Sequence, residues 1–230
     1  MAVSLGFFSL PVSAQHQIET RNTSYDHTIG GVQFRVPGSY MHPSHIRGRA
    51  DGALFFMFWV SDGKPEAAGV TPIGTKDRVG RAIFWPTEPG RPFNSGEDFL
   101  VRVRAARPME RDKALERQQF TRDGVTRGGG PTTNENGLEC HTYATGYKYC
   151  ATPIGTDPDV AMALQLFPEN LFWRMRLYSP ADSLWAELDF PELGQAHWPE
   201  VVCRTLLLIR TWRISDGPPP PDCSKRPRLS

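Results

Sequence analysis

Hydrophobic and polar residues alternate along much of the chain, and a period of two is the pattern of strands that bury one face. Two segments show it most clearly, because in each of them three apolar residues alternate with two arginines. The arginine pairs are Arg102 with Arg104 and Arg174 with Arg176. A further run, 54–60, is apolar on both faces and predicts a central, covered strand. The predicted strands are 32–36, 53–60, 81–85, 99–105, 142–149, 160–167 and 171–178.

Apolar residues spaced three and four apart predict helices between the strands. The strongest signal follows Pro199, a suitable first helical residue, and continues with Val202, Leu206 and Ile209 along one face. A competing interpretation makes 204–214 a strand, because Thr, Leu and Ile are plentiful there. Weaker signals predict helices over 109–119, after Pro108, and over 182–188, with Asp182 as the capping residue.

A short repeat divides the chain into two parts. The pentapeptide TPIGT at 71–75 recurs at 152–156, and the two arginine-bearing segments align without gaps. We interpret this as a divergent duplication; the alternative is two unrelated strands that both alternate. The predicted fold class is α+β, with two similar halves, each an antiparallel sheet with a packed helix, forming one compact unit. The predicted boundaries are a signal peptide at 1–14, an N-terminal half at 15–123, a flexible connection at 124–136, a C-terminal half at 137–217 and a Pro-rich basic tail at 218–230.

The N-terminal stretch has features of an export signal. An apolar run over 2–12 ends in Val12-Ser13-Ala14, the small-x-small form that signal peptidase accepts, although no Lys or Arg precedes Arg21. The alternative is a buried N-terminal strand. The run is too short to span a bilayer, and no later stretch is long and charge-free enough to do so. We therefore predict a periplasmic protein without a stable membrane span.

The four cysteines predict two disulfides, because none of them lies in a C-x-x-C pair typical of zinc or redox sites. Cys140 and Cys150 flank a three-residue hairpin loop that ends at Gly146, in the left-handed position such a loop needs. Pairing outward from the loop places the two cysteines at a non-hydrogen-bonded position, about 4.5 Å apart between Cα atoms, within disulfide range. Cys203 and Cys223 would then tie the proline-rich tail to the last helix. The alternative is four reduced thiols in a cytosolic protein.

The histidines do not predict a metal site. His42 and His45 are three apart, but Pro43 argues against a helix that would bring them onto one face. In the predicted hairpin, His141 lies opposite Tyr149, where aromatic packing accounts for it. We expect no metal and no cofactor.

Catalytic motifs are also missing from the sequence. There is no nucleophile elbow of the G-x-S-x-G form. The segment 69–76 resembles a phosphate-binding loop superficially, but it lacks the Gly-Lys-Ser/Thr ending, and Pro72 removes a backbone donor. No spacing singles out a pair of carboxylates for hydrolysis. We therefore predict no catalytic residues and a protein that is not an enzyme.

The nearly equal numbers of basic and acidic residues argue against a partner that binds only through a high density of negative charge. The chain has 26 Lys and Arg against 25 Asp and Glu, a net charge of +1, so neither nucleic acid nor an anionic membrane is attracted in general. The residues that suggest binding are Arg102, Arg104, Arg174 and Arg176. Two arginines spaced by two on an exposed strand face form a cationic ridge that can bind carboxylates bidentately. The alternative is that they form cross-strand salt bridges on a solvated face.

The segment 29–40, IGGVQFRVPGSY, with its Phe-x-Val-Pro-x-x-Tyr motif at 34–40, resembles the start of small uncharacterised periplasmic proteins of proteobacteria. That group is similar to immunity proteins that guard cells against toxins of contact-dependent secretion, especially type VI secretion. The leader and the duplicated layout fit the same group. The resemblance implies a protein-binding inhibitor that occludes the active site of a partner toxin. The alternatives are an envelope hydrolase with an unrecognised carboxylate pair and a structural envelope component.

Overall fold

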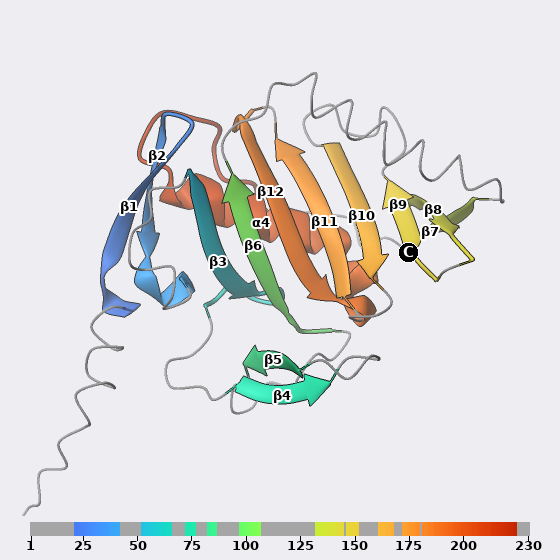
Figure 1. Ribbon diagram of the computed structural model, residues 1–230. Helices are drawn as coiled ribbons and strands as arrows, with labels where there is room; N and C mark the ends of the chain where they lie inside the picture. The colour runs from blue at the N-terminus through green and yellow to red at the C-terminus, as the bar shows by residue number, and fades with distance from the viewer. Residues whose placement is uncertain are drawn as a thin grey trace, which may run out of the picture.

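The computed structural model of the chain is shown in Figure 1. A single antiparallel sheet dominates it, and a long helix packs on one face of this sheet. The residues described, to which all structural statements refer, are 21–41, 52–65, 72–76, 82–86, 97–106, 132–144, 146–151, 161–167, 172–179 and 181–224.

Within these residues, eight strands form the main sheet, and every neighbouring pair is antiparallel. In spatial order they are β3 (Ala53–Trp59), β6 (Leu100–Ala106), β12 (Leu184–Pro191), β11 (Phe172–Ser179), β10 (Ala161–Phe167), β9 (Lys148–Ala151), β8 (Leu138–Thr142) and β7 (Thr133–Glu135). Two further two-stranded ribbons pair β1 (Ser24–Ile29) with β2 (Val32–Pro37) and β4 (Pro72–Lys76) with β5 (Ala82–Pro86). Short 3-10 turns η1 (Gly38–Tyr40) and η2 (Glu192–His197) follow β2 and β12.

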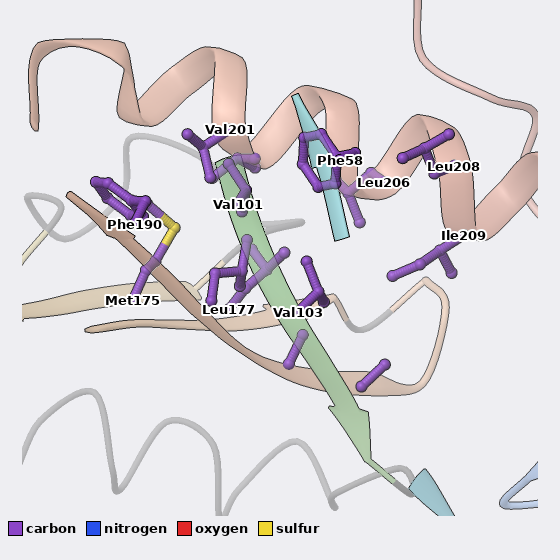
Figure 2. Close-up of a cluster of buried hydrophobic side chains, with 14 of the residues drawn as sticks. Phe58, Val101, Val103, Met175, Leu177, Phe190, Val201, Leu206, Leu208 and Ile209 are labelled. Carbon is purple, nitrogen blue, oxygen red and sulfur yellow. The ribbon is translucent and has the colours of Figure 1, made fainter. Parts of the chain in front are cut away.

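Helix α4 (Trp198–Trp212) crosses behind the sheet in the view of Figure 1 and covers β3, β6, β12 and β11. Figure 2 shows the interface between the helix and these four strands. Each fully buried Leu, Ile, Val, Phe or Met side chain stabilises the fold by about 1.5–3 kcal/mol relative to exposure, so this layer holds the helix in place. The labelled core residues are Phe58, Val101, Val103, Met175, Leu177, Phe190, Val201, Leu206, Leu208 and Ile209.

The C-terminal end of α4 is fixed by a buried charge. Asp182 is 2% exposed and accepts hydrogen bonds from Arg210 Nη2 at 2.9 Å and from Ser179 Oγ at 2.6 Å. Arg210 Nη1 also donates to the carbonyl oxygen of Pro219 at 3.2 Å, so the same arginine contacts the tail. The carboxylate therefore joins the β11–β12 turn, the helix and the residues that follow it.

The β1–β2 ribbon is attached to the same end of the helix. Arg213 forms a bridge with Phe34, and the Ile214 amide donates to the Gln33 carbonyl oxygen at 2.9 Å. The ring of Tyr40 packs edge-on to Trp212 with centroids 4.9 Å apart. Phe34 is buried, so the ribbon contributes to the core as well as covering it.

Most predicted elements are present. The seven strand predictions all overlap observed strands, and the prediction over 142–149 covers parts of the two strands of one hairpin. The helix after Pro199 is confirmed, and the competing strand over 204–214 is wrong. The described residues form a compact, sheet-dominated fold with one long α-helix, which agrees with the predicted fold class only in part. The halves do not each form a sheet, however, because β3 and β6 join the same sheet as β7 to β12.

Other predictions differ from the structure. The helix predicted over 182–188 is wrong, because Leu184–Pro191 is strand β12 and Asp182 does not cap a helix. The apolar run at 54–60 is an edge strand rather than a central one, since β3 pairs with β6 alone in the described sheet. Thr133–Glu135, predicted as part of a flexible connection, forms β7. The predicted signal peptide, the helix over 109–119, the repeat copy at 152–156, and His42 and His45 lie outside the described residues.

No helix in the described part of the chain has the length and apolar composition needed to cross a bilayer.

Candidate functional site

The β8–β9 hairpin has the predicted register. Cys140 pairs with Cys150, His141 pairs with Tyr149, and Gly146 has a φ of 84° at the end of the loop. The two cysteines form a disulfide with a Cα separation of 4.1 Å. This part of the sheet is therefore closed covalently, as the loop chemistry predicts.

The second predicted disulfide, between Cys203 and Cys223, is also present, with a Cα separation of 5.8 Å. It joins the buried side of α4 to the proline-rich segment beyond the helix. Two disulfides in a chain of this kind fit an oxidising compartment.

The four candidate arginines alternate with buried residues along their strands, and the strand register places all four on one face of the main sheet. The buried residues face α4, which lies behind the sheet in Figure 1, so the arginines lie on the opposite face, which we call the outer face. Arg102 and Arg104 are on β6, and Arg174 and Arg176 are on β11. Strand β12 runs between them and pairs with both. The structure therefore brings the two arginine pairs together across one intervening strand.

Cross-strand pairing arranges the outer face in two rows, which we name the Asp189 row and the Glu187 row. Both rows run across β3, β6, β12, β11, β10, β9 and β8. The Asp189 row contains Met57, Arg102, Asp189, Arg174, Gln165, Tyr149 and His141. The Glu187 row contains Phe55, Arg104, Glu187, Arg176, Ala163, Ala151 and Glu139. Each row thus places one β12 carboxylate between two arginines.

In the Asp189 row the polar groups are closely bonded. Arg174 binds Asp189 bidentately, with Nε to Oδ1 at 2.8 Å and Nη2 to Oδ2 at 3.0 Å. This hydrogen bonding raises the pKa of the Arg174 guanidinium above its ordinary value. Further along, Gln165 Nε2 donates to Tyr149 Oη at 2.8 Å. The bidentate pairing of Arg174 with Asp189 fixes both of these side chains in one geometry.

In the Glu187 row the contacts are longer. Arg104 Nη1 lies 3.8 Å from Glu187 Oε2, and Arg176 Nε lies 3.9 Å from Oε1 of the same carboxylate. The side chains of Arg104 and Arg176 are 51% and 41% exposed, more than that of Arg174 at 33%. Two arginines thus share one carboxylate at ion-pair distance and face solvent.

Aromatic rings lie against two of the four arginines, Arg104 and Arg174. The Arg104 guanidinium carbon lies 5.7 Å from the centre of the Phe55 ring, and that of Arg174 lies 5.6 Å from the centre of Phe172. Cation–π contacts of this kind limit the motion of the guanidinium groups without neutralising their positive charge.

The Asp189 row ends in an aromatic cluster. His141 is 5% exposed and packs edge-on to Tyr143 at 4.7 Å, and Tyr143 packs edge-on to Tyr149 at 5.3 Å. Burial, together with Tyr143 and Tyr147, raises the pKa of the Tyr149 phenol, while Arg176 opposes that shift. His141 therefore has aromatic packing, as expected, but against Tyr143 rather than the predicted Tyr149, and its buried Nδ1 has no hydrogen-bond partner among the described residues. Among the described residues, no three His, Cys, Asp or Glu side chains are grouped to hold a metal ion.

The sequence prediction missed the two carboxylates. Glu187 and Asp189 fall in and beside a segment that was predicted as a helix, so their position between the arginines did not emerge. A signal was present, since Leu184, Ala186 and Leu188 alternate with Trp185, Glu187 and Asp189 along β12.

Comparison with known proteins found a similarity in three-dimensional structure but none to a family model or a curated protein. No protein-family model matches the chain, and no curated protein matches it. The fold is similar to that of Smlt3025, an immunity protein of the Stenotrophomonas maltophilia type IV secretion system, with a TM-score of 0.56 and 13% identity. The alignment covers 84% of this chain and 94% of Smlt3025. At this identity the likeness establishes a shared fold, and the secretion system of the neighbour is type IV rather than the type VI suggested by the sequence resemblance.

Proposed function

We propose that this chain is a periplasmic immunity protein that binds a partner toxin and blocks it without catalysing a reaction. The observation that carries the proposal is the fold likeness to the immunity protein Smlt3025, which extends over most of both chains. Two disulfides support placement outside the cytosol, because oxidised cysteines persist in the periplasm.

The outer face is the surface that we assign to the toxin. It carries both arginine pairs and the two β12 carboxylates, and a face with both signs of charge favours one complementary protein surface over a generic polyanion. A type IV effector is the favoured toxin class, because the protein with the similar fold belongs to that system.

The proposal is tested by measuring whether this chain protects cells from a toxin encoded next to it. The open reading frames next to this gene would be expressed in the periplasm of a laboratory bacterium, and any toxic one would be co-expressed with this chain. We expect growth to recover when this chain carries an export signal and to fail when it lacks one. We also expect the purified pair to co-elute as a stable complex.

Other results would reject the proposal. If no neighbouring product is toxic, or if the chain with an export signal gives no protection, the immunity function is wrong. Degradation of purified cell-wall or lipid substrates by this chain alone would favour the hydrolase alternative instead. Self-association without a toxin complex would favour a structural envelope component.

A further inference from the structure

We propose that Arg104 and Arg176 are the residues that hold the partner, and that they bind carboxylate side chains on an acidic patch of the toxin surface. This inference rests on the proposed immunity function and adds to it the contact residues and the chemistry of the partner.

The two rows of the outer face differ in how far their arginines are already satisfied. Arg174 uses two of its N–H groups on Asp189 at 2.8 and 3.0 Å. A guanidinium committed to one bidentate carboxylate has fewer donors for a second. The Asp189 row therefore acts as an internal brace that fixes β11 to β12.

In the Glu187 row the donors are still available. Arg104 and Arg176 each approach Glu187 only to 3.8–3.9 Å, and neither makes a hydrogen bond within the described residues. Each guanidinium carries five N–H donors in a planar fork that matches the two oxygens of a carboxylate. Because Arg104 lies over the ring of Phe55, less of its side-chain freedom is lost on binding.

The charge pattern favours protein carboxylates over nucleic acid or lipid phosphates. Glu187 and Asp189 lie between the arginines, so a continuous line of phosphates would meet negative charge at the centre of the site. The whole chain has a net charge of only +1. Separate carboxylates on a folded partner can contact each arginine from the side that faces away from Glu187.

Charge reversal tests this assignment. Arg104→Glu and Arg176→Glu would be prepared singly and together, with Arg35→Glu as the matched control. Arg35 also pairs with a carboxylate, that of Asp26, and its side chain is 62% exposed, but it lies on the β1–β2 ribbon. Affinity for the purified neighbouring toxin would be measured by titration calorimetry. We expect each single reversal in the Glu187 row to weaken binding by at least about thirtyfold. Arg35→Glu is expected to stay within about twofold of the wild type.

An arginine-directed label gives a second measurement on the unmodified chain. Arg104 and Arg176 should react with p-hydroxyphenylglyoxal in the free protein and be protected in the toxin complex, as read by mass spectrometry. Arg35 should react equally in both states. The labelling result does not depend on the folding of any variant.

The outcomes separate the two proposals. If the wild type binds and protects but the reversals keep full affinity, or the label reaches both arginines in the complex, the Glu187 row is not the contact site and the immunity function still stands. If the wild type neither binds nor protects, the immunity function is wrong and this inference is wrong with it. Submicromolar binding of the wild type to a 20-base-pair DNA duplex or to phosphatidylglycerol vesicles, lost on Arg104→Glu, would also overturn the assignment to protein carboxylates.

Discussion

The buried carboxylate of Asp182 gives the sharpest stability prediction. Asp182→Asn keeps the size of the side chain but removes its charge and replaces one acceptor oxygen with an N–H donor. Arg210 Nε lies 3.1 and 3.0 Å from the two carboxylate oxygens, and Arg213 Nη1 lies 3.8 Å from Oδ1. In the variant, both guanidinium groups would lie beside a neutral amide.

The expected loss in the free energy of unfolding follows from how deeply the ion pair of Asp182 is buried. Removing one partner of a buried ion pair costs about 3–5 kcal/mol, because the remaining charge stays desolvated. The Arg210 and Arg213 side chains are each 14% exposed, so some solvent reaches them, and we expect a loss of about 3 kcal/mol. In a chain of this size, this lowers the midpoint of thermal unfolding by about 6–12 °C.

Urea unfolding followed by circular dichroism would measure the change in the free energy of unfolding. The matched control is Asp26→Asn, because Asp26 also receives two hydrogen bonds from one arginine, Arg35, at 2.8 and 3.1 Å. That pair is 62% and 63% exposed, so its loss should leave the unfolding midpoint unchanged within error. Equal shifts for the two variants would refute the argument that burial gives the Asp182 pair its importance.

Three further predictions concern other parts of the fold. Replacing both cysteines of the β8–β9 hairpin with alanine should lower the free energy of unfolding by about 3 kcal/mol, and reductant should then have a smaller effect on the variant than on the wild type in thermal melts. Burial raises the pKa of Glu135, but hydrogen bonds from Lys148 and other donors outweigh it and leave the pKa below its ordinary 4.5. The stabilisation from this carboxylate is therefore present above pH 4.5 and is lost as the pH falls below it, so Glu135→Gln should flatten that part of a stability-versus-pH curve. Gly194→Ala should cost about 1–3 kcal/mol in denaturant titrations, because the new Cβ would lie 2.5 Å from Cζ of the fully buried Phe99; an unchanged midpoint would mean that the ring can move aside.

Local chemistry explains why parts of the fold were predictable. The hairpin register follows from loop length and from the glycine at its end, which together determine which residues face one another. The last helix follows from a proline at its start and an apolar stripe of helical period. These signals lie within a few residues of the structure that they specify.

The missed features depend on contacts that are distant in sequence. Leu184–Pro191 has the alternation of a strand, but Asp182 before it favoured the prediction of a capped helix. The segment forms strand β12 because it pairs with β6 on one side and with β11 on the other. For the same reason, the two arginine pairs were recognisable as ridges, while the carboxylates between them were not. Strand order across a sheet is a long-range property, and alternation alone does not determine it.

The position of β12 between β6 and β11 has a consequence for how the chain reaches its native state. Residues 100–106 leave the ribosome, and in an exported protein pass the translocase, well before residues 184–191, with which they pair. The antiparallel pair of β3 and β6 must therefore wait with Leu54, Phe56 and Phe58 uncovered until the final helix arrives. Late, non-local pairing of this kind generally slows folding and prolongs the exposure of hydrophobic surface. The chain should accordingly depend on a chaperone in the compartment where it folds, and its yield should fall when synthesis outpaces that supply.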